Sequence, residues 1–422
     1  MQINVRKIMT SILSIVLVTG LTVVAAPAQA AKTTITYFSF SASPDHIKTL
    51  NKIVGAFERK NPTIQVKIQS AAYADYFTKL KTRIAANQSP DTFELDYQDF
   101  VTYADAGALL NLKQVSMKDK AFNKNSYYGK AYDVFAQNGK QYGLPSSYST
   151  VVLFYNKDLF KAAGVDTPNS SWDWSDEAAA DKALAAKLPA GTYADFQPVQ
   201  FWEFYKVLAQ AGGQFLSANH KTAQFNKQPG INALNWLVSK QNNGWKPTPA
   251  QMGTMDDGAM FAAGKLAMWH SGIWEFDAMK NASFKWDVAV EPGGVTPGNH
   301  FFANDVSISS KTKNADAAWK WAKFLTSDAS SVKSMIDSSW EIPATSAKAP
   351  LAAYLNSPLP PANRQAVFDA LKNPVVPPVI RQQGQLQDAV NAWLSKALDG
   401  SVSVVDALNG AATDVNAILA KE

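Results

Sequence analysis

The pattern of apolar and polar positions changes its period several times along the first hundred residues. Ile64, Val66 and Ile68 alternate as in a half-buried strand, and on either side apolar residues recur at helical spacing. Ser43-Pro44 begins the first of these helices and Asn61-Pro62 ends it. In order, the predicted elements are a strand at 34–40, a helix at 43–60, a strand at 64–68, a helix around 77–84 and a strand at 91–96. This β-α-β-α-β order predicts an α/β lobe with a largely parallel sheet.

Three later segments are predicted to carry the chain between two lobes. Val151 to Tyr155 has the length and composition of a buried strand, and the polar run Ser146 to Thr150 before it is too short for a domain and too polar for a core. We interpret that polar run as the first crossing. Phe301 to Ser309 is predicted to be a strand that returns to the first lobe, and Trp340 to Ala344 to be the last crossing.

Helices account for most of the remaining pattern, and no internal repeat or low-complexity tract is found. Gly258 to Lys265 does not fit a phosphate-binding loop, because five residues separate its glycines and Leu266 stands where Ser or Thr is needed. Helices are predicted within 171–187, 198–211, 231–240 and 314–327 and as a final pair near the C-terminus.

Several segments resemble one family. Tyr142-Gly143-Leu144-Pro145, the run from Leu153 to Phe160 and Ala163-Gly164 resemble a signature of the extracellular solute-binding proteins of bacterial ABC transporters. The similarity is to their sugar-binding, maltose-binding-protein-like branch, and Phe261 to Met268 and Asn314 to Ser327 resemble it too. The resemblance implies an α/β, two-lobed periplasmic-binding-protein-like fold of type II with three inter-lobe crossings. It also implies a ligand held between the lobes and ABC permease subunits as partners.

The N-terminus has the features of an export signal. A basic head at Arg6 and Lys7 precedes an apolar stretch from Ile8 to Val24, and Ala28-Gln29-Ala30 offers a cleavage site. An uncleaved membrane anchor is the competing interpretation because of the length of the apolar stretch. The cleavage triplet favours a signal peptide at 1–30 and a periplasmic or secreted protein.

About 390 residues remain after that signal, which is more than one hydrophobic core normally serves. Two lobes are therefore expected. The predicted N-terminal lobe comprises 31–147 and 305–343, and the predicted C-terminal lobe comprises 148–304 and 344–422.

The amino-acid composition excludes several classes of function. The chain contains no cysteine, which excludes thiol catalysis, thiolate metal sites and a lipid-modified cysteine. Its formal charge of +5 falls to +3 without Arg6 and Lys7 and is spread without basic runs, so nucleic acid is not an expected partner. We expect a monomer.

The positions of the histidines and acidic residues give little indication of a metal site or of catalysis. The four histidines are far apart in sequence and lack helical partners, so no metal site and no cofactor is predicted; only His270, beside Trp269, merits attention. The alternative of paired glycosidase carboxylates rests on residues whose separation the sequence does not give. Those residues are Asp96, Glu203, Glu275, Asp305 and Glu341.

A sugar site combines aromatic rings with groups that hydrogen-bond to hydroxyls, and ligands of α/β sheets bind beyond the carboxyl ends of strands. We apply this rule to the predicted strand ends, the crossings and the tryptophans, and the family resemblance points to the same regions. Together they indicate fifteen candidate ligand-binding residues. They are Phe40, Ser41, Tyr73, Tyr76, Asp96, Tyr97, Tyr148, Trp202, Trp269, Trp274, Asn304, Asp305, Trp340, Glu341 and Arg381.

Within that set, Asp96, Asp305 and Glu341 are expected to accept hydrogen bonds from hydroxyls, and Trp274 and Trp340 to stack on sugar rings. Other tryptophans are assigned to structure: packing for Trp319, Trp321 and Trp393, and a turn for Trp172 and Trp174. Competing roles are packing for Tyr73, Tyr76 and Trp202 and a surface salt bridge for Arg381.

The predicted function is the substrate-binding component of an ABC-type carbohydrate importer, which captures an oligosaccharide or other sugar without catalysis. Two alternatives stay open. One is an exported glycosidase or polysaccharide lyase, and the other is the same fold binding a non-sugar solute such as a polyamine.

Overall fold

The computed structural model describes residues 32–422, and the predicted signal peptide lies outside them. Six strands form one sheet, in the order β12-β6-β11-β3-β1-β2. Their bounds are β1 (Thr33–Ser39), β2 (Ile64–Ser70), β3 (Thr92–Asp96), β6 (Gly143–Ser149), β11 (Phe302–Ile308) and β12 (Ile342–Pro343).

This sheet is mixed, which corrects the prediction of a largely parallel one. Strand β1 pairs in parallel with both β2 and β3, as the β-α-β-α-β pattern requires. Strand β11 is antiparallel to β3 and β6, and β12 is antiparallel to β6. The pattern of the first hundred residues could not contain these pairings, because β11 and β12 belong to distant parts of the chain.

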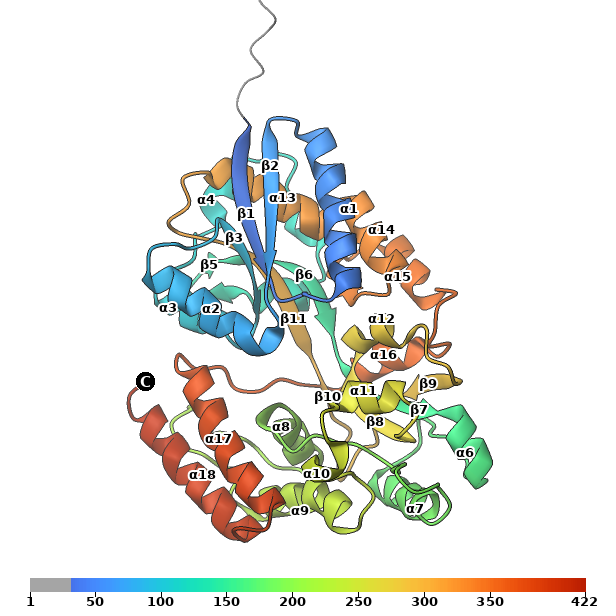
Figure 1. Cartoon of the computed structure of the whole chain (residues 1–422). Coiled ribbons are helices and arrows are strands. Elements are labelled where there is room, and N and C mark those ends of the chain that lie inside the picture. The colour runs from blue at the N-terminus through green and yellow to red at the C-terminus, as the bar shows by residue number, and fades with distance from the viewer. Residues whose placement is uncertain (1–31) are drawn as a thin grey trace, which may run out of the picture.

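Helices cover both faces of the six-stranded sheet (Figure 1). On one face lie α1 (Pro44–Lys60) and α13 (Ala315–Ser327), whose Phe57 and Trp321 pack edge to face in a buried cluster. Ser43 caps α1 by accepting a hydrogen bond from the backbone N–H of His46, as predicted for Ser43-Pro44. On the other face lie α2 (Tyr73–Ala85) and α3 (Phe100–Asp105). The helix α14 (Ala329–Asp337) packs against α1.

A smaller sheet organises the second half of the molecule. It has three antiparallel strands in the order β8-β7-β9, with bounds β7 (Val151–Asn156), β8 (Met268–Gly272) and β9 (Trp286–Ala289). Four helices pack together nearby around a separate core: α8 (Phe201–Gln210), α9 (Gln228–Asn242), α17 (Gln383–Leu398) and α18 (Val404–Leu419).

The remaining elements connect and cover these main ones. They are α4 (Lys113–Ser116), η1 (Lys124–Ser126), α5 (Gly129–Asp133), β4 (Ala136–Gln137), β5 (Lys140–Gln141), α6 (Lys157–Ala163), α7 (Trp174–Ala185), α10 (Pro249–Met252), α11 (Asp257–Ala262), η2 (Ile273–Glu275), α12 (Phe276–Met279), β10 (Asn299–His300), α15 (Lys348–Leu355), α16 (Gln365–Ala370) and β13 (Pro374–Val375). Of the helices within 32–422, none combines the length and the apolar character that crossing a membrane would require.

We call the part built on the six-stranded sheet the N-terminal lobe and the part built on the three-stranded sheet the C-terminal lobe; they are the upper and lower halves of Figure 1. The chain passes between them where β6 runs into β7, where β10 runs into β11, and after β12. These are the three crossings that the pattern predicts. Strand β6 extends to Ser149 and β11 begins at Phe302, so the larger sheet reaches a few residues beyond the predicted changeover points.

Candidate functional site

Polar side chains gather where the crossing strands leave the six-stranded sheet. Asn304 on β11 lies opposite Asp96 of β3 on one side and Ser147 of β6 on the other. Its amide nitrogen Nδ2 donates to Glu341 Oε2 at 2.8 Å and to Ser147 Oγ at 3.3 Å, and the Ser147 hydroxyl also donates to Glu341. We call Asp96, Ser147, Asn304 and Glu341 the crossing cluster. Because Ser147, Asn304 and Glu341 come from the three crossings, the cluster lies at the join of the lobes.

The acids near this cluster are buried without cationic partners. Burial raises the pKa of Glu341, although the hydrogen bond from Ser147 opposes the shift. Burial also raises the pKa of Glu94, which accepts from the Ser39 hydroxyl at 2.7 Å, to about 8. Neither carboxyl takes part in an ion pair within residues 32–422. These groups are therefore hydrogen-bond acceptors that can also take up protons.

Asp96 joins the cluster to an aromatic edge of the N-terminal lobe. Its Oδ2 accepts from the Tyr73 hydroxyl at 2.6 Å, and its Oδ1 accepts from two backbone N–H groups of the following turn. Tyr73 is 55% exposed, and its ring meets the half-buried ring of Phe40 edge to face at 5.3 Å. Ser41 is buried and its N–H donates to Ser39 Oγ. Phe40, Tyr73 and Asp96 are thus brought together.

A run of rings lies on the side of the C-terminal lobe. Trp274 and Phe302, both half-buried, lie 5.8 Å apart between centroids. Phe302 stacks on His300 at 5.1 Å with a 17° interplanar angle, and His300 lies 5.4 Å from the half-buried ring of Trp202. The ring of Trp274 folds over Gly272 so closely that a Cβ there would lie 2.1 Å from it. We call Trp202, Phe302 and Trp274 the ring platform.

The platform and the crossing cluster adjoin each other on one face of β11, and we call the two together the strip. Phe302 and Asn304 are two residues apart on β11, and alternate side chains of a strand point to the same face. The strip therefore runs from the rings through Asn304 to Asp96 and Tyr73. It presents aromatic faces beside amide and carboxyl groups, which is the combination that binds a sugar.

Three of the predicted site residues belong instead to the interior, which corrects their assignment. Tyr76 is fully buried, and its hydroxyl donates to the carbonyls of Phe38 and Glu94. Trp269 is 1% exposed and donates to Asp257. Asp305 is fully buried and accepts from the N–H of Leu95 and the hydroxyl of Ser307. Asp305 follows Asn304 directly, so the pleat of β11 turns it to the opposite face.

Four further candidates lie at the margin. Trp340 is 8% exposed and stacks on His46 at 4.2 Å with nearly parallel rings, so one of its faces is already covered. Tyr148 is buried against Tyr128 at 4.8 Å, and Tyr97 is buried with its hydroxyl unpaired. Arg381 is exposed and lies 3.4 Å from Asp105, the surface salt bridge that competed with its binding role.

Sequence reasoning missed Ser147, His300 and Phe302 as parts of this region. The signal for Phe302 was present, since a residue two positions before Asn304 in a strand shares its face. The position of His300 depends on Trp202, ninety-eight residues away, and no local pattern reports that contact.

The interior of the C-terminal lobe contains a dense group of buried charges. Lys240 contacts Glu177 and Asp195, and Lys206 lies 2.7 Å from Glu203 and 3.0 Å from Glu291. We call these six residues, together with His270, the charge network.

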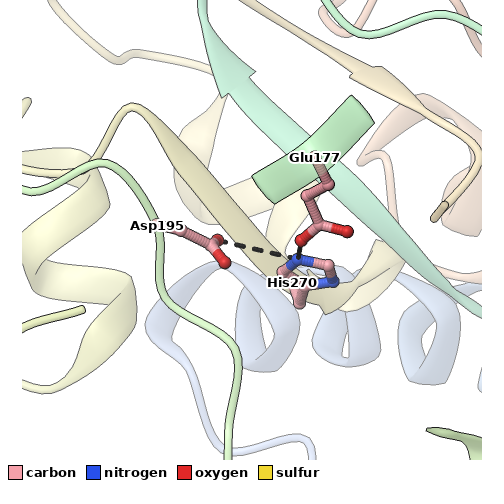
Figure 2. Close-up of side chains that lie close together, drawn as sticks. All are labelled: Glu177, Asp195 and His270. Atoms are coloured by element: carbon pink, nitrogen blue, oxygen red, sulfur yellow. Dashed lines mark hydrogen bonds and ion pairs between the residues drawn. The ribbon is translucent and has the colours of Figure 1, made fainter. Parts of the chain in front are cut away.

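His270 sits inside this network. Figure 2 shows Glu177 of α7 and Asp195 of the loop before α8 meeting at its imidazole, with Nε2 to carboxylate distances of 2.9 and 3.6 Å. Its Nδ1 lies 2.8 Å from Glu291. Since carboxylates can only accept, both ring nitrogens donate and the ring is cationic. Burial alone would lower the pKa of His270, but the charges of Asp195 and Glu177 outweigh it and raise that pKa well above its ordinary value.

The spacing of Glu177, Asp195 and His270 would suit a metal ion, because their donor atoms lie within 4.8 Å of one another. The ammonium group of Lys240 is bound to both carboxylates, however, and both nitrogens of His270 are donors. A metal would have to displace Lys240 and deprotonate His270. Lys240 and the two N–H groups of His270 thus occupy the positions that a metal ion would take.

Comparison with known proteins supplies the remaining evidence. A family described as bacterial extracellular solute-binding protein matches residues 43–331. The multiple sugar-binding protein of Streptococcus mutans is 30% identical over 70% of this chain and 71% of its own length. The galactooligosaccharide-binding protein of Bacillus subtilis is 24% identical over 85% and 84%. The solved structure of an ABC substrate-binding protein from Listeria monocytogenes, in complex with cycloalternan, shares 40% identity with a TM-score of 0.89 and covers 92% of this chain and 99% of that one.

Proposed function

Because the chain belongs to the family of bacterial extracellular solute-binding proteins, we propose that it is the substrate-binding component of an ABC-type carbohydrate importer. It captures an oligosaccharide between its lobes and delivers it to membrane permease subunits. The family consists of solute-binding proteins, and no catalytic step is part of the proposal. The cycloalternan complex of the Listeria relative, at 40% identity, supports an oligosaccharide as the ligand class.

One observation carries the proposal: the ring platform and the crossing cluster form a single strip at the join of the lobes. Trp274 and Phe302 offer the apolar faces on which sugar C–H groups stack, and Asn304, Glu341 and Asp96 offer acceptors for hydroxyls. A site rich in acids with few exposed rings would favour a polyamine. The half-buried rings therefore favour a sugar over that alternative.

Contacts between the lobes support a mechanism of closure. Lys280, after α12, lies 2.9 Å from Asp45 on α1. Gln387 on α17 donates to Gln98 at 3.3 Å, and Thr102 on α3 donates to the carbonyl of Arg381 at 2.8 Å. Such contacts exist only while the lobes are together, so a ligand that touches both lobes would shift the protein towards the closed state.

The division of the chain and its location complete the proposal. The N-terminal lobe comprises 31–147 and 305–343 and the C-terminal lobe 148–304 and 344–422, with the joins close to Ser149 and Phe302. The protein is exported through a signal peptide at 1–30 and acts as a monomer in the periplasm or outside the cell.

A thermal-shift screen of residues 31–422 against mono-, di- and oligosaccharides tests the function. A ligand that binds only the native state raises the melting temperature, and the rise grows as the ligand concentration exceeds the dissociation constant. We expect a shift with one oligosaccharide series and no product by chromatography afterwards. Product formation would indicate a glycosidase or lyase, and a shift only with polyamines would indicate a non-sugar solute.

A further inference from the structure

We propose that His300 is a positioning residue for the sugar site. It packs behind the ring platform and holds those rings in the arrangement that binds the ligand. This inference rests on the proposed function. His300 is fully buried on β10, so it touches no ligand itself. Three rings surround it: Phe302 at 5.1 Å, Trp202 at 5.4 Å and Tyr205 at 5.5 Å. Two of these belong to the platform.

The hydrogen bond of His300 fixes the orientation of its ring. Nε2 lies 2.7 Å from the backbone carbonyl of Trp202, and a carbonyl can only accept, so Nε2 carries the proton. The imidazole is thereby tied to the first turn of α8, while its face lies almost parallel to Phe302 on β11. One side chain thus sets the relation between two rings that come from different elements.

The backbone of His300 adds a connection between two crossings. Its carbonyl accepts from the Thr150 hydroxyl at 2.6 Å, and Thr150 lies between β6 and β7. Phe301 alone separates His300 from β11. His300 is therefore placed at the point about which the lobes would move on closure, and the platform is held to that point.

The charge network holds His300 in turn. Glu203 lies 3.5 Å from Nε2 and Glu291 lies 3.7 Å from Nδ1, and Lys206 contacts both carboxylates. These acids are fixed by their ion pairs, so they restrict the rotation of the imidazole. The buried charges thereby give the half-exposed rings a rigid support, which preorganisation of a binding site requires.

A double-mutant cycle tests the proposal, with affinity measured by titration calorimetry for the sugar that gives the thermal shift. His300→Gln is expected to weaken binding about ten-fold or more, because the ring behind Phe302 is lost. In a Phe302→Leu background the same change is expected to have a much smaller effect, since the residue through which it acts is gone. His220→Asn, at an exposed histidine, is the control and should leave affinity unchanged.

A merely structural role would give a different result. It would lower the melting temperature and leave the affinity of the folded protein unchanged, and either that result or additive effects in the cycle would overturn the proposal.

If His300→Gln does not fold, the measurement moves to His300→Phe, which keeps a ring beside Phe302 and removes the hydrogen bond to Trp202. Its affinity should then fall, and should fall less in a Trp202→Leu background; an unchanged affinity overturns the proposal. If the unchanged protein binds no sugar, the proposed function itself fails and the inference falls with it.

Discussion

The two lobes bury acidic groups in opposite ways. In the N-terminal lobe Glu94, Asp305 and Glu341 are buried among hydroxyls and backbone N–H groups, and burial raises the pKa of each. In the C-terminal lobe Glu177, Asp195, Glu203 and Glu291 are buried against Lys206, Lys240 and His270. In the first arrangement hydrogen-bond donors alone face the carboxyls, whereas in the second Lys206, Lys240 and His270 supply opposite charges.

Under the proposed function, this difference separates the residues that bind the ligand from the residues that support the site. Acids without cations lie beside the crossing cluster, where hydroxyls of a sugar would arrive. The paired charges lie deeper and hold the elements that carry the ring platform.

Replacing Lys240 should have the largest effect on stability. Lys240→Met leaves Glu177 and Asp195 buried without their cation, and breaking a buried pair in this way costs about 3–5 kcal/mol. Urea unfolding would measure the loss. Lys333→Met is the matched control, because Lys333 forms an exposed pair with Asp337 and should change stability by less than about 1 kcal/mol. Equal effects of the two changes would show that the buried pairs of Lys240 contribute no more to stability than an exposed pair.

Replacing the two predicted stacking tryptophans should affect different properties. Trp274→Ala removes a half-buried ring of the platform and is expected to weaken sugar binding about ten-fold or more, with little loss of stability. Trp340→Ala removes a ring packed on His46 in the core and is expected to lower stability by about 3 kcal/mol. Calorimetric titration and thermal unfolding of both variants would measure this, and a reversed result would return Trp340 to the site.

Per pH unit, the pKa of Glu94 gives a smaller effect on stability, and this effect has a definite sign. Its carboxyl has a pKa of about 8 in the folded protein against 4.5 ordinarily, so the folded state binds more protons between these values. Its contribution to stability is fully present below pH 4.5 and is lost as the pH rises to about 8, by at most about 1.4 kcal/mol per pH unit. Glu94→Gln should flatten this dependence and raise the melting temperature at pH 8 more than at pH 5. Parallel curves for the two proteins would show that Glu94 is ionised when folded.

The sequence predicted the elements well, but it could not decide which candidate residues share a face, and β11 shows why. The period of the apolar pattern identified the strand and its role as a crossing. It also selected Asn304 and Asp305 together, although neighbouring residues of a strand face opposite sides. Which of them joins the crossing cluster depends on the register with β3 and β6, where pairing shifts between Asn304 and Asp305. That register is a property of the assembled sheet.

The charge network could not be predicted from local sequence patterns, for a related reason. His270 drew attention by its place beside Trp269, but its partners lie at Glu177, Asp195 and Glu291. Only the tertiary fold brings together α7, the loop before α8, β8 and the loop after β9, which carry these residues. Sequence patterns report the neighbours along an element, and this group has almost none.

The smallest expected effect lies where the two lobes touch. Lys280 and Asp45 form a partly exposed pair across the boundary, with Asp277 as a second acceptor for Lys280 at 2.6 Å. Asp45→Asn removes the inter-lobe partner and leaves the pair within the C-terminal lobe intact. It should therefore favour the open state slightly and weaken sugar binding by a factor of about two to five at low salt. Titrations at low and high ionic strength would measure this, and the difference from the unchanged protein should shrink as salt screens the pair.

Lys79→Gln, which breaks an exposed pair with Asp75 inside the N-terminal lobe, should leave affinity unchanged at both salt concentrations. If Asp45→Asn behaved in the same way, the contact between the lobes would have no part in closure, and the acids at the join would act through the ligand alone.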